Sequence, residues 1–347
     1  MVDGKRTKTV DSGAPTKPTS PNTSAAGLVV EPADSGNDQH AFDAQLAQTL
    51  AETEAAVLGV TGEALSPLEA ESWVRARSIV ADFRPVPWFI WRICNFVLGK
   101  SGQSNPVSEG LVLGLRRLLF AAASDPALGS GEKVNTVKRA IQVLSPDVIA
   151  AVSVIHAVNR RLATHQFERI WRPILDDAIL RARIGLDVGD LCPEFGAGRG
   201  MLAGFAGRCG LGVLIGSGDL DRARRALEML ASGTDIKLVG LSVYQVDPLQ
   251  VSAMILTASG CSRDASFGTV GYSLERGDGG KSIVQNDDQM RWLSAFGVIE
   301  GIRTGNAASV RPEHWEMMGI PDAKTQGEVV NELKRLLRRG HGWSWIL

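Results

Sequence analysis

The sequence predicts an all-α protein, a bundle of many helices with extra helices before it and closing helices after it. Apolar residues recur at helical spacing along most of the chain. Helix start signals also recur: Ser66-Pro67-Leu68-Glu69 reads as a capping box with proline at the first helical position, and Ser145-Pro146 as a second start. The alternation of apolar and polar residues that marks strands does not separate these segments.

The first 82 residues are expected to form a disordered lead and a helical prelude. Residues 1–43 are rich in Ser, Thr, Pro, Gly and Asp and have little to bury, which predicts disorder. Helical periodicity begins at Ala44 and continues until two nearby glycines break it. The helix that starts at Ser66 completes the prelude, residues 44–82.

Residues 83–347 are expected to form one helical domain that includes the C-terminal helices. A glycine-rich linker is expected at 276–282, and the tail GWSWIL is expected to pack on its own domain or on a partner, because tryptophans are rarely left exposed. The expected helices cover residues 88–98, 107–123, 134–144, 147–162, 167–182, 201–214, 219–233, 247–256, 286–299, 312–318 and 325–339.

Composition narrows the class of partner and the compartment. The formal net charge of -1 gives no basic field for nucleic acid. The four cysteines have no metal-site spacing and are expected to be buried, reduced thiols. No secretory signal or apolar run of membrane-spanning length is visible, so we expect a cytoplasmic protein with no membrane or nucleic-acid partner.

Residues 115–152 resemble the front half of the HD-related output domain (HDOD) family. There a helix ends in an LLxxANS-like segment, and a later helix reads V-x-T/S-V-x-x-A-I-x-x-L-G. The similarity continues through 167–172, 201–214 and 247–256, and covers about residues 85–272. The matching residues of the front half are Leu118, Leu119, Ala122, Ser124, Gly129, Val134, Thr136, Val137, Ala140, Ile141 and Leu144.

The resemblance implies an HD-like helical bundle whose metal ligands have been lost. In catalytically competent relatives a His-Asp dyad and flanking histidines hold metals that generate a hydroxide nucleophile. Here the dyad position reads Gly207-Arg208, and the two flanking histidine positions read Pro173 and Pro248. Glycine and proline offer no ligand, and arginine repels a cation. We therefore expect a bacterial signalling or regulatory module without catalysis, metal or cofactor, which acts through protein contacts and could contact a second copy of itself.

Four polar residues are candidates for a ligand site near the former metal cavity: Glu194, Arg199, Arg208 and Asp247. An alternative interpretation is therefore a degenerate HD-type sensor that binds a nucleotide through Arg199 and Arg208, or a phosphodiesterase.

A further alternative is an S-adenosylmethionine-dependent methyltransferase, because residues 194–200, EFGAGRG, resemble the first motif of that class. The competing explanation is that this stretch is a loop followed by a helix. On that helix Gly200, Gly204, Gly207 and Gly210 would then allow close packing.

Overall fold

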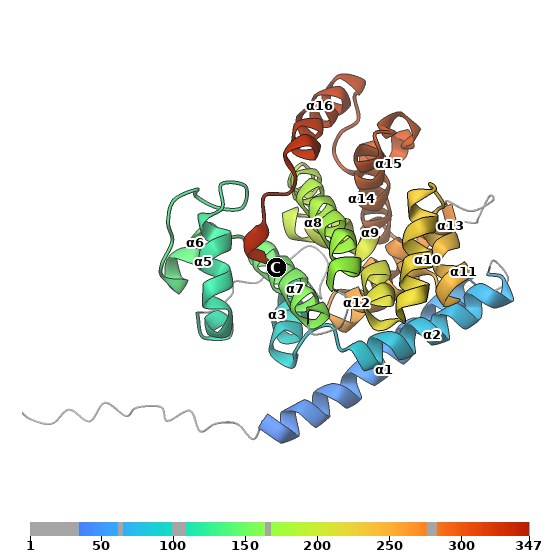
Figure 1. The fold of residues 1–347 in the computed structure, drawn as a ribbon. Coiled ribbons are helices and arrows are strands. Elements are labelled where there is room, and N and C mark those ends of the chain that lie inside the picture. The colour runs from blue at the N-terminus through green and yellow to red at the C-terminus, as the bar shows by residue number, and fades with distance from the viewer. Residues whose placement is uncertain (1–34, 62–64, 99–108, 164–167, 276–282, 347) are drawn as a thin grey trace, which may run out of the picture.

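The computed structural model describes residues 35–61, 65–98, 109–163, 168–275 and 283–346, and within these ranges it contains helices and no strand (Figure 1). The predicted all-α class is confirmed. In chain order the elements are α1 Ser35–Thr61, α2 Pro67–Phe83, α3 Trp88–Leu98, α4 Glu109–Val112, η2 Leu113–Leu115, α5 Arg116–Ser124, α6 Val137–Val143, α7 Pro146–Leu162, α8 Glu168–Asp190, α9 Ala197–Ser217, α10 Leu220–Ala231, α11 Ile236–Tyr244, α12 Pro248–Ala258, α13 Arg263–Glu275, α14 Asp287–Thr304, η3 Ala307–Ser309, α15 Pro312–Met317, α16 Ala323–Arg339 and η4 Ser344–Ile346.

Helix α9 is the centre of the bundle. It is buried along nearly its whole length and packs against α7, α8, α12 and α14. It is also the one described helix that is long and apolar enough to cross a bilayer, but 83% of the qualifying window is buried inside the fold. That burial is typical of the core helix of a folded domain.

Glycines let α8 and α9 approach closely. A β-carbon at Gly200 would collide with the backbone of Gly185, and one at Gly204 with the Arg181 carbonyl. Gly210 meets the Pro248 carbonyl on α12 in the same way. The predicted packing role is confirmed for these positions. It is wrong for Gly207, where a β-carbon would lie an ordinary 3.6 Å from Cδ of Arg181.

The N-terminal helices lie along one side of the bundle (Figure 1). Helix α1 begins at Ser35 rather than at Ala44. Polar residues extend it toward the N-terminus, as in the hydrogen bond of 2.9 Å between Gln39 and Asp43. Phe42 also packs against the ring of Trp91. The rest of the predicted lead, 1–34, lies outside the described residues. The capping box at Ser66 is confirmed, and α1 and α2 both pack on α12.

The helix expected at 107–123 is interrupted. The described chain from 109 forms α4, a 3₁₀ turn and α5, with Gly114, a poor helix former, at the break. The helix expected from 134 begins at Val137, because the Val134 amide bonds to Ser124 Oγ (2.8 Å) and Thr136 caps the helix. Helices α11 and α13 were not predicted. The linker expected at 276–282 lies outside the described residues.

The C-terminal tail folds back onto its own domain, which is one of the two alternatives expected from the sequence. Trp343 and Ile346 are buried, and η4 packs on α5 and α7 (Figure 1). Trp345 Nε1 donates to Asp125 Oδ2 (3.1 Å), and the Ile346 carbonyl lies 2.9 Å from Nδ1 of His156. The four cysteines are free and buried, as predicted.

Candidate functional site

Arg208, at the position that the sequence comparison aligned with a metal dyad, belongs to a network of ion pairs, which we call the arginine–carboxylate cluster. Arg208 on α9 reaches Asp177 on α8 (Nε–Oδ2 3.2 Å) and Glu300 on α14 (Nη2–Oε1 3.7 Å). Arg181 pairs with the same Asp177 oxygen at 2.9 Å and also with Glu300. Arg303 Nε binds the other Asp177 oxygen at 2.6 Å. The cluster thus joins three helices.

The charges of the cluster are mutually dependent. Burial alone would raise the pKa of Asp177, but Arg181, Arg208 and Arg303 together lower that pKa below its ordinary value. Arg181 has only 3% of its side chain exposed. A guanidinium at that depth requires the two carboxylates beside it.

The cluster does not fit a metal site. Gly207 has no donor, and Asp177 and Glu300 are held by arginines. In the part of the chain that the structure describes, no three His, Cys, Asp or Glu side chains gather as metal ligands. The cavity that remains beside Gly207 and Arg208 has a volume of about 10 Å³, roughly that of one water probe.

The two prolines at the flanking positions lie on α8 and α12, which both pack against α9. The residues after Pro173, Ile174 and Leu175, face Gly212 rather than Gly207. Pro248 lies against Gly240 and Gly210.

Asp247 serves as a helix cap. It is buried, and Oδ1 accepts the Leu249 amide of α12 (2.8 Å) while Oδ2 accepts the Ser273 hydroxyl (2.8 Å). Burial raises the pKa of its carboxyl above the ordinary range. Both oxygens are used within the fold, so Asp247 is not directed at a ligand.

Arg199 and Glu194 lie at the other end of α9. Arg199 Nη1 pairs with Asp288 Oδ1 (3.3 Å), and Arg291 links Asp288 to the exposed Glu194. Arg199 and Arg208 are nine positions apart in one helix, about 14 Å along its axis. The structure therefore does not bring the four predicted ligand residues into one site.

The glycine-rich stretch at 194–200 comprises the end of the turn after α8 and the first turn of α9. It follows α8 and opens α9, so the strand that a methyltransferase motif requires is replaced by a helix. The amide of Gly198 donates to Asp147 Oδ2 of α7 (2.7 Å). That side chain supplies the cap that Gly196, at the N-cap position, cannot provide.

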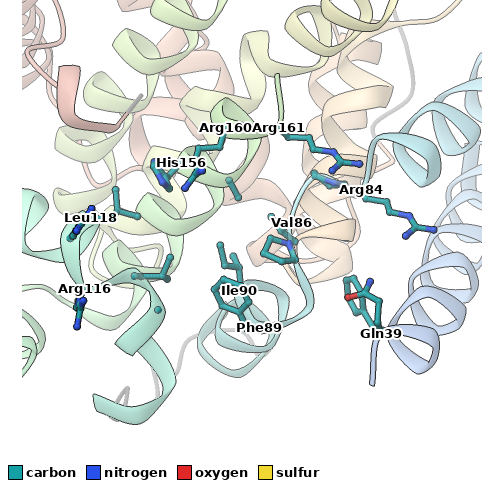
Figure 2. A pocket seen from close by; sticks show the side chains of 17 residues that line it. Gln39, Arg84, Val86, Phe89, Ile90, Arg116, Leu118, His156, Arg160 and Arg161 are labelled. Atoms are coloured by element: carbon teal, nitrogen blue, oxygen red, sulfur yellow. The ribbon is translucent and has the colours of Figure 1, made fainter. Parts of the chain in front are cut away.

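A separate hollow lies between α1, the turn before α3, η2, α5 and α7; we call it the basic pocket (Figure 2). Its volume is about 750 Å³, and none of the described residues that line it is acidic. Apolar side chains of Val86, Phe89, Ile90, Leu115 and Leu118 form part of its wall, and His156 joins them. Its cationic residues are Arg84, Arg116, Arg117, Arg160 and Arg161.

The arginines of the basic pocket differ in what they already contact. Arg84 pairs with Asp43 (3.2 Å), and Arg161 Nε donates to the Phe83 carbonyl (3.0 Å). Within the described ranges Arg116, Arg117 and Arg160 form no ion pair. Sequence reasoning missed this site. Its only local signal is two Arg-Arg pairs on helices far apart in the chain.

Comparisons with known proteins place the fold but not the family. No protein-family model and no curated protein matches the sequence. The fold is similar to the crystal structure of a "putative signal transduction protein" from Marinobacter aquaeolei VT8, with a TM-score of 0.57 and 16% sequence identity. The similarity covers 80% of this chain but 66% of that one, so this chain spans about two thirds of its neighbour's length.

Proposed function

We propose that this protein is a non-catalytic regulatory module of bacterial signalling, of HDOD type, which acts through contacts with other proteins. The observation that carries the proposal is the arginine–carboxylate cluster at the position of the metal dyad. A hydrolytic centre of this class needs open ligands for a divalent cation. Here two carboxylates are neutralised by Arg181, Arg208 and Arg303, so the site is used to join α8, α9 and α14.

The structural neighbour supports the same class of function. That protein is described as a signal transduction protein, and it shares the fold over most of this chain. A helical module without its own chemistry can contribute to signalling by presenting a surface that changes with its state. The bacterial origin and the protein partner follow from the resemblance to the HDOD family.

The geometry favours none of the three alternatives. The phosphodiesterase lacks metal donors at Gly207-Arg208, and the nucleotide sensor loses its proposed pair because Arg199 and Arg208 face different partners. The methyltransferase lacks the strand before its glycine motif.

The test combines metal analysis, turnover and partner capture with the full chain. After growth with added manganese and iron, we expect no stoichiometric metal and no hydrolysis of bis(p-nitrophenyl) phosphate or cyclic dinucleotides. We also expect a purified partner, first found by crosslinking in cells, to bind saturably. Metal-dependent turnover that is lost in Asp177→Ala but kept in the neighbouring Asp176→Ala would show that the proposal is wrong.

A further inference from the structure

We propose that the basic pocket binds a small phosphorylated ligand, with the chemistry of a nucleotide: a multiply charged phosphate group joined to one flat apolar part. Arginines from three separate elements border one pocket whose wall is partly apolar (Figure 2). The inference stands apart from the proposed function, because the pocket would bind its ligand whether or not the protein signals.

The charge of the pocket points to an anion. Five arginines and, among the residues that the structure describes, no acidic residue line this pocket, in a chain whose net charge is -1. Arg116, Arg117 and Arg160 form no ion pair in the described structure. Like charges that share a concave surface raise the local potential and attract an anion. Guanidinium groups match the paired oxygens of phosphate and hold them by charge-assisted hydrogen bonds.

The remaining wall suits an apolar ring. Val86 and Ile90 are buried beneath the pocket, and Phe89 beside them is only partly covered. An aromatic face of this kind can stack on a nucleobase. The volume of about 750 Å³ lies within the range of small-molecule sites, so a compact ligand fits better than an extended acidic peptide.

His156 adds a polar ring whose contact with the C-terminal tail favours one tautomer. Its Nδ1 lies 2.9 Å from the Ile346 carbonyl, which can only accept, so in the neutral ring Nδ1 carries the hydrogen. Nε2 is then an acceptor that a ligand hydroxyl, such as that of a ribose, can satisfy. This contact comes from η4, so the C-terminal tail determines which ring nitrogen of His156 carries the hydrogen.

The test is calorimetric titration of the full chain with ATP, tripolyphosphate, pyrophosphate, adenosine and a polyglutamate peptide at moderate salt. We expect ATP and tripolyphosphate to bind with one-to-one stoichiometry. Arg116→Gln/Arg117→Gln should weaken both by about tenfold or more, because charge-assisted contacts are lost. Arg224→Gln/Arg225→Gln is the matched control. This exposed arginine pair on α10 lies outside the pocket, and its loss should leave both affinities unchanged.

The variant Phe89→Ala distinguishes a site for a nucleotide from a site for phosphate groups alone. It should weaken ATP by about tenfold, as expected for lost base stacking, and leave tripolyphosphate unchanged. Equal weakening of both ligands would overturn the nucleotide-like part of the proposal.

Three results would overturn the whole. One is that ATP, tripolyphosphate and pyrophosphate all bind more weakly than about 1 mM. Another is that the α10 control loses as much affinity as the pocket variant. The third is that polyglutamate binds the pocket more tightly than the phosphates, which would assign it to an acidic protein segment. Circular dichroism and melting curves verify that each variant is folded.

Discussion

Two arginine-rich regions of this protein use the same side chain in opposite ways. In the arginine–carboxylate cluster Arg181 is 3% exposed and is held by Asp177 and Glu300. In the basic pocket the arginines are exposed, and the described lining of the space between them contains no acidic residue. A buried charge must be paired to be tolerated, so the buried arginines of the cluster need the two carboxylates beside them. The exposed arginines of the basic pocket are hydrated and do not need such partners. Their position around one hollow therefore indicates a site for an anionic ligand.

Removal of a cluster carboxylate should have the largest effect. Asp177→Ala takes away the common partner of Arg181, Arg208 and Arg303 and leaves buried positive charge uncompensated. We expect the free energy of unfolding to fall by about 3–5 kcal/mol, measured by urea denaturation. Asp176→Ala is the control, because its side chain is 45% exposed and should cost within about 0.5 kcal/mol. Similar losses for both would remove the distinction between the regions.

The same carboxylate predicts a pH dependence. The arginines lower the pKa of Asp177 in the folded protein, despite its burial. Its stabilising contribution is therefore complete above the ordinary pKa of an aspartate, about 3.9, and is lost as the pH falls through the lower folded value. The difference in urea midpoint between the wild-type protein and Asp177→Ala should therefore become smaller as the pH is lowered into the acid range.

Two glycines on α9 should respond in opposite directions to the same substitution. A β-carbon at Gly204 would collide with the Arg181 carbonyl, so Gly204→Ala must push α8 away and should cost about 2–3 kcal/mol. At Gly207 the new atom would lie 3.6 Å from Cδ of Arg181. There alanine adds helix propensity, and Gly207→Ala should stabilise by up to about 1 kcal/mol. Thermal melting distinguishes the two, and a loss at Gly207 equal to that at Gly204 would contradict the packing geometry.

The fold was largely predictable because its signals are local. The capping box at Ser66, the proline at the start of α7 and the aspartate caps of α10 and α12 are each contained within a few residues. The errors arose where tertiary contacts decide. Phe42 gains a ring partner only when α1 meets Trp91, and the Ser124 hydroxyl delays the start of α6.

Neither region could be assembled from sequence, because its members are distant in the chain. Gly207-Arg208 marked the position of the cluster, but Glu300 comes from α14, a helix outside the segment that resembles a known family. The basic pocket combines Arg84, the pair beginning at Arg116 and the pair beginning at Arg160. Only the packing of α3 and α5 near α7 brings those charges to one hollow.

The C-terminal tail is expected to link α5 and α7, which both border the basic pocket. Its hydrogen bond should contribute less to the free energy of unfolding than the contacts discussed above. Trp345 Nε1 donates to Asp125 at the end of α5, while Ile346 contacts His156 on α7. Trp345→Phe keeps the ring and removes the donor, and should cost about 1 kcal/mol. In an Asp125→Ala background the same change should cost nearly nothing, and a double-mutant cycle in urea measures that coupling. Equal costs in both backgrounds would show that the hydrogen bond does not stabilise the protein.

The smallest effect on stability is expected in the pocket itself. Arg116→Gln/Arg117→Gln removes two exposed charges that have no ion-pair partner in the described structure, so the free energy of unfolding should change by less than about 0.5 kcal/mol. Any change should be a gain at low salt that fades at high salt, because the substitution relieves repulsion that salt also screens. Urea denaturation at two salt concentrations measures it. A loss of several kcal/mol would mean that these arginines, like those of the cluster, are needed for folding.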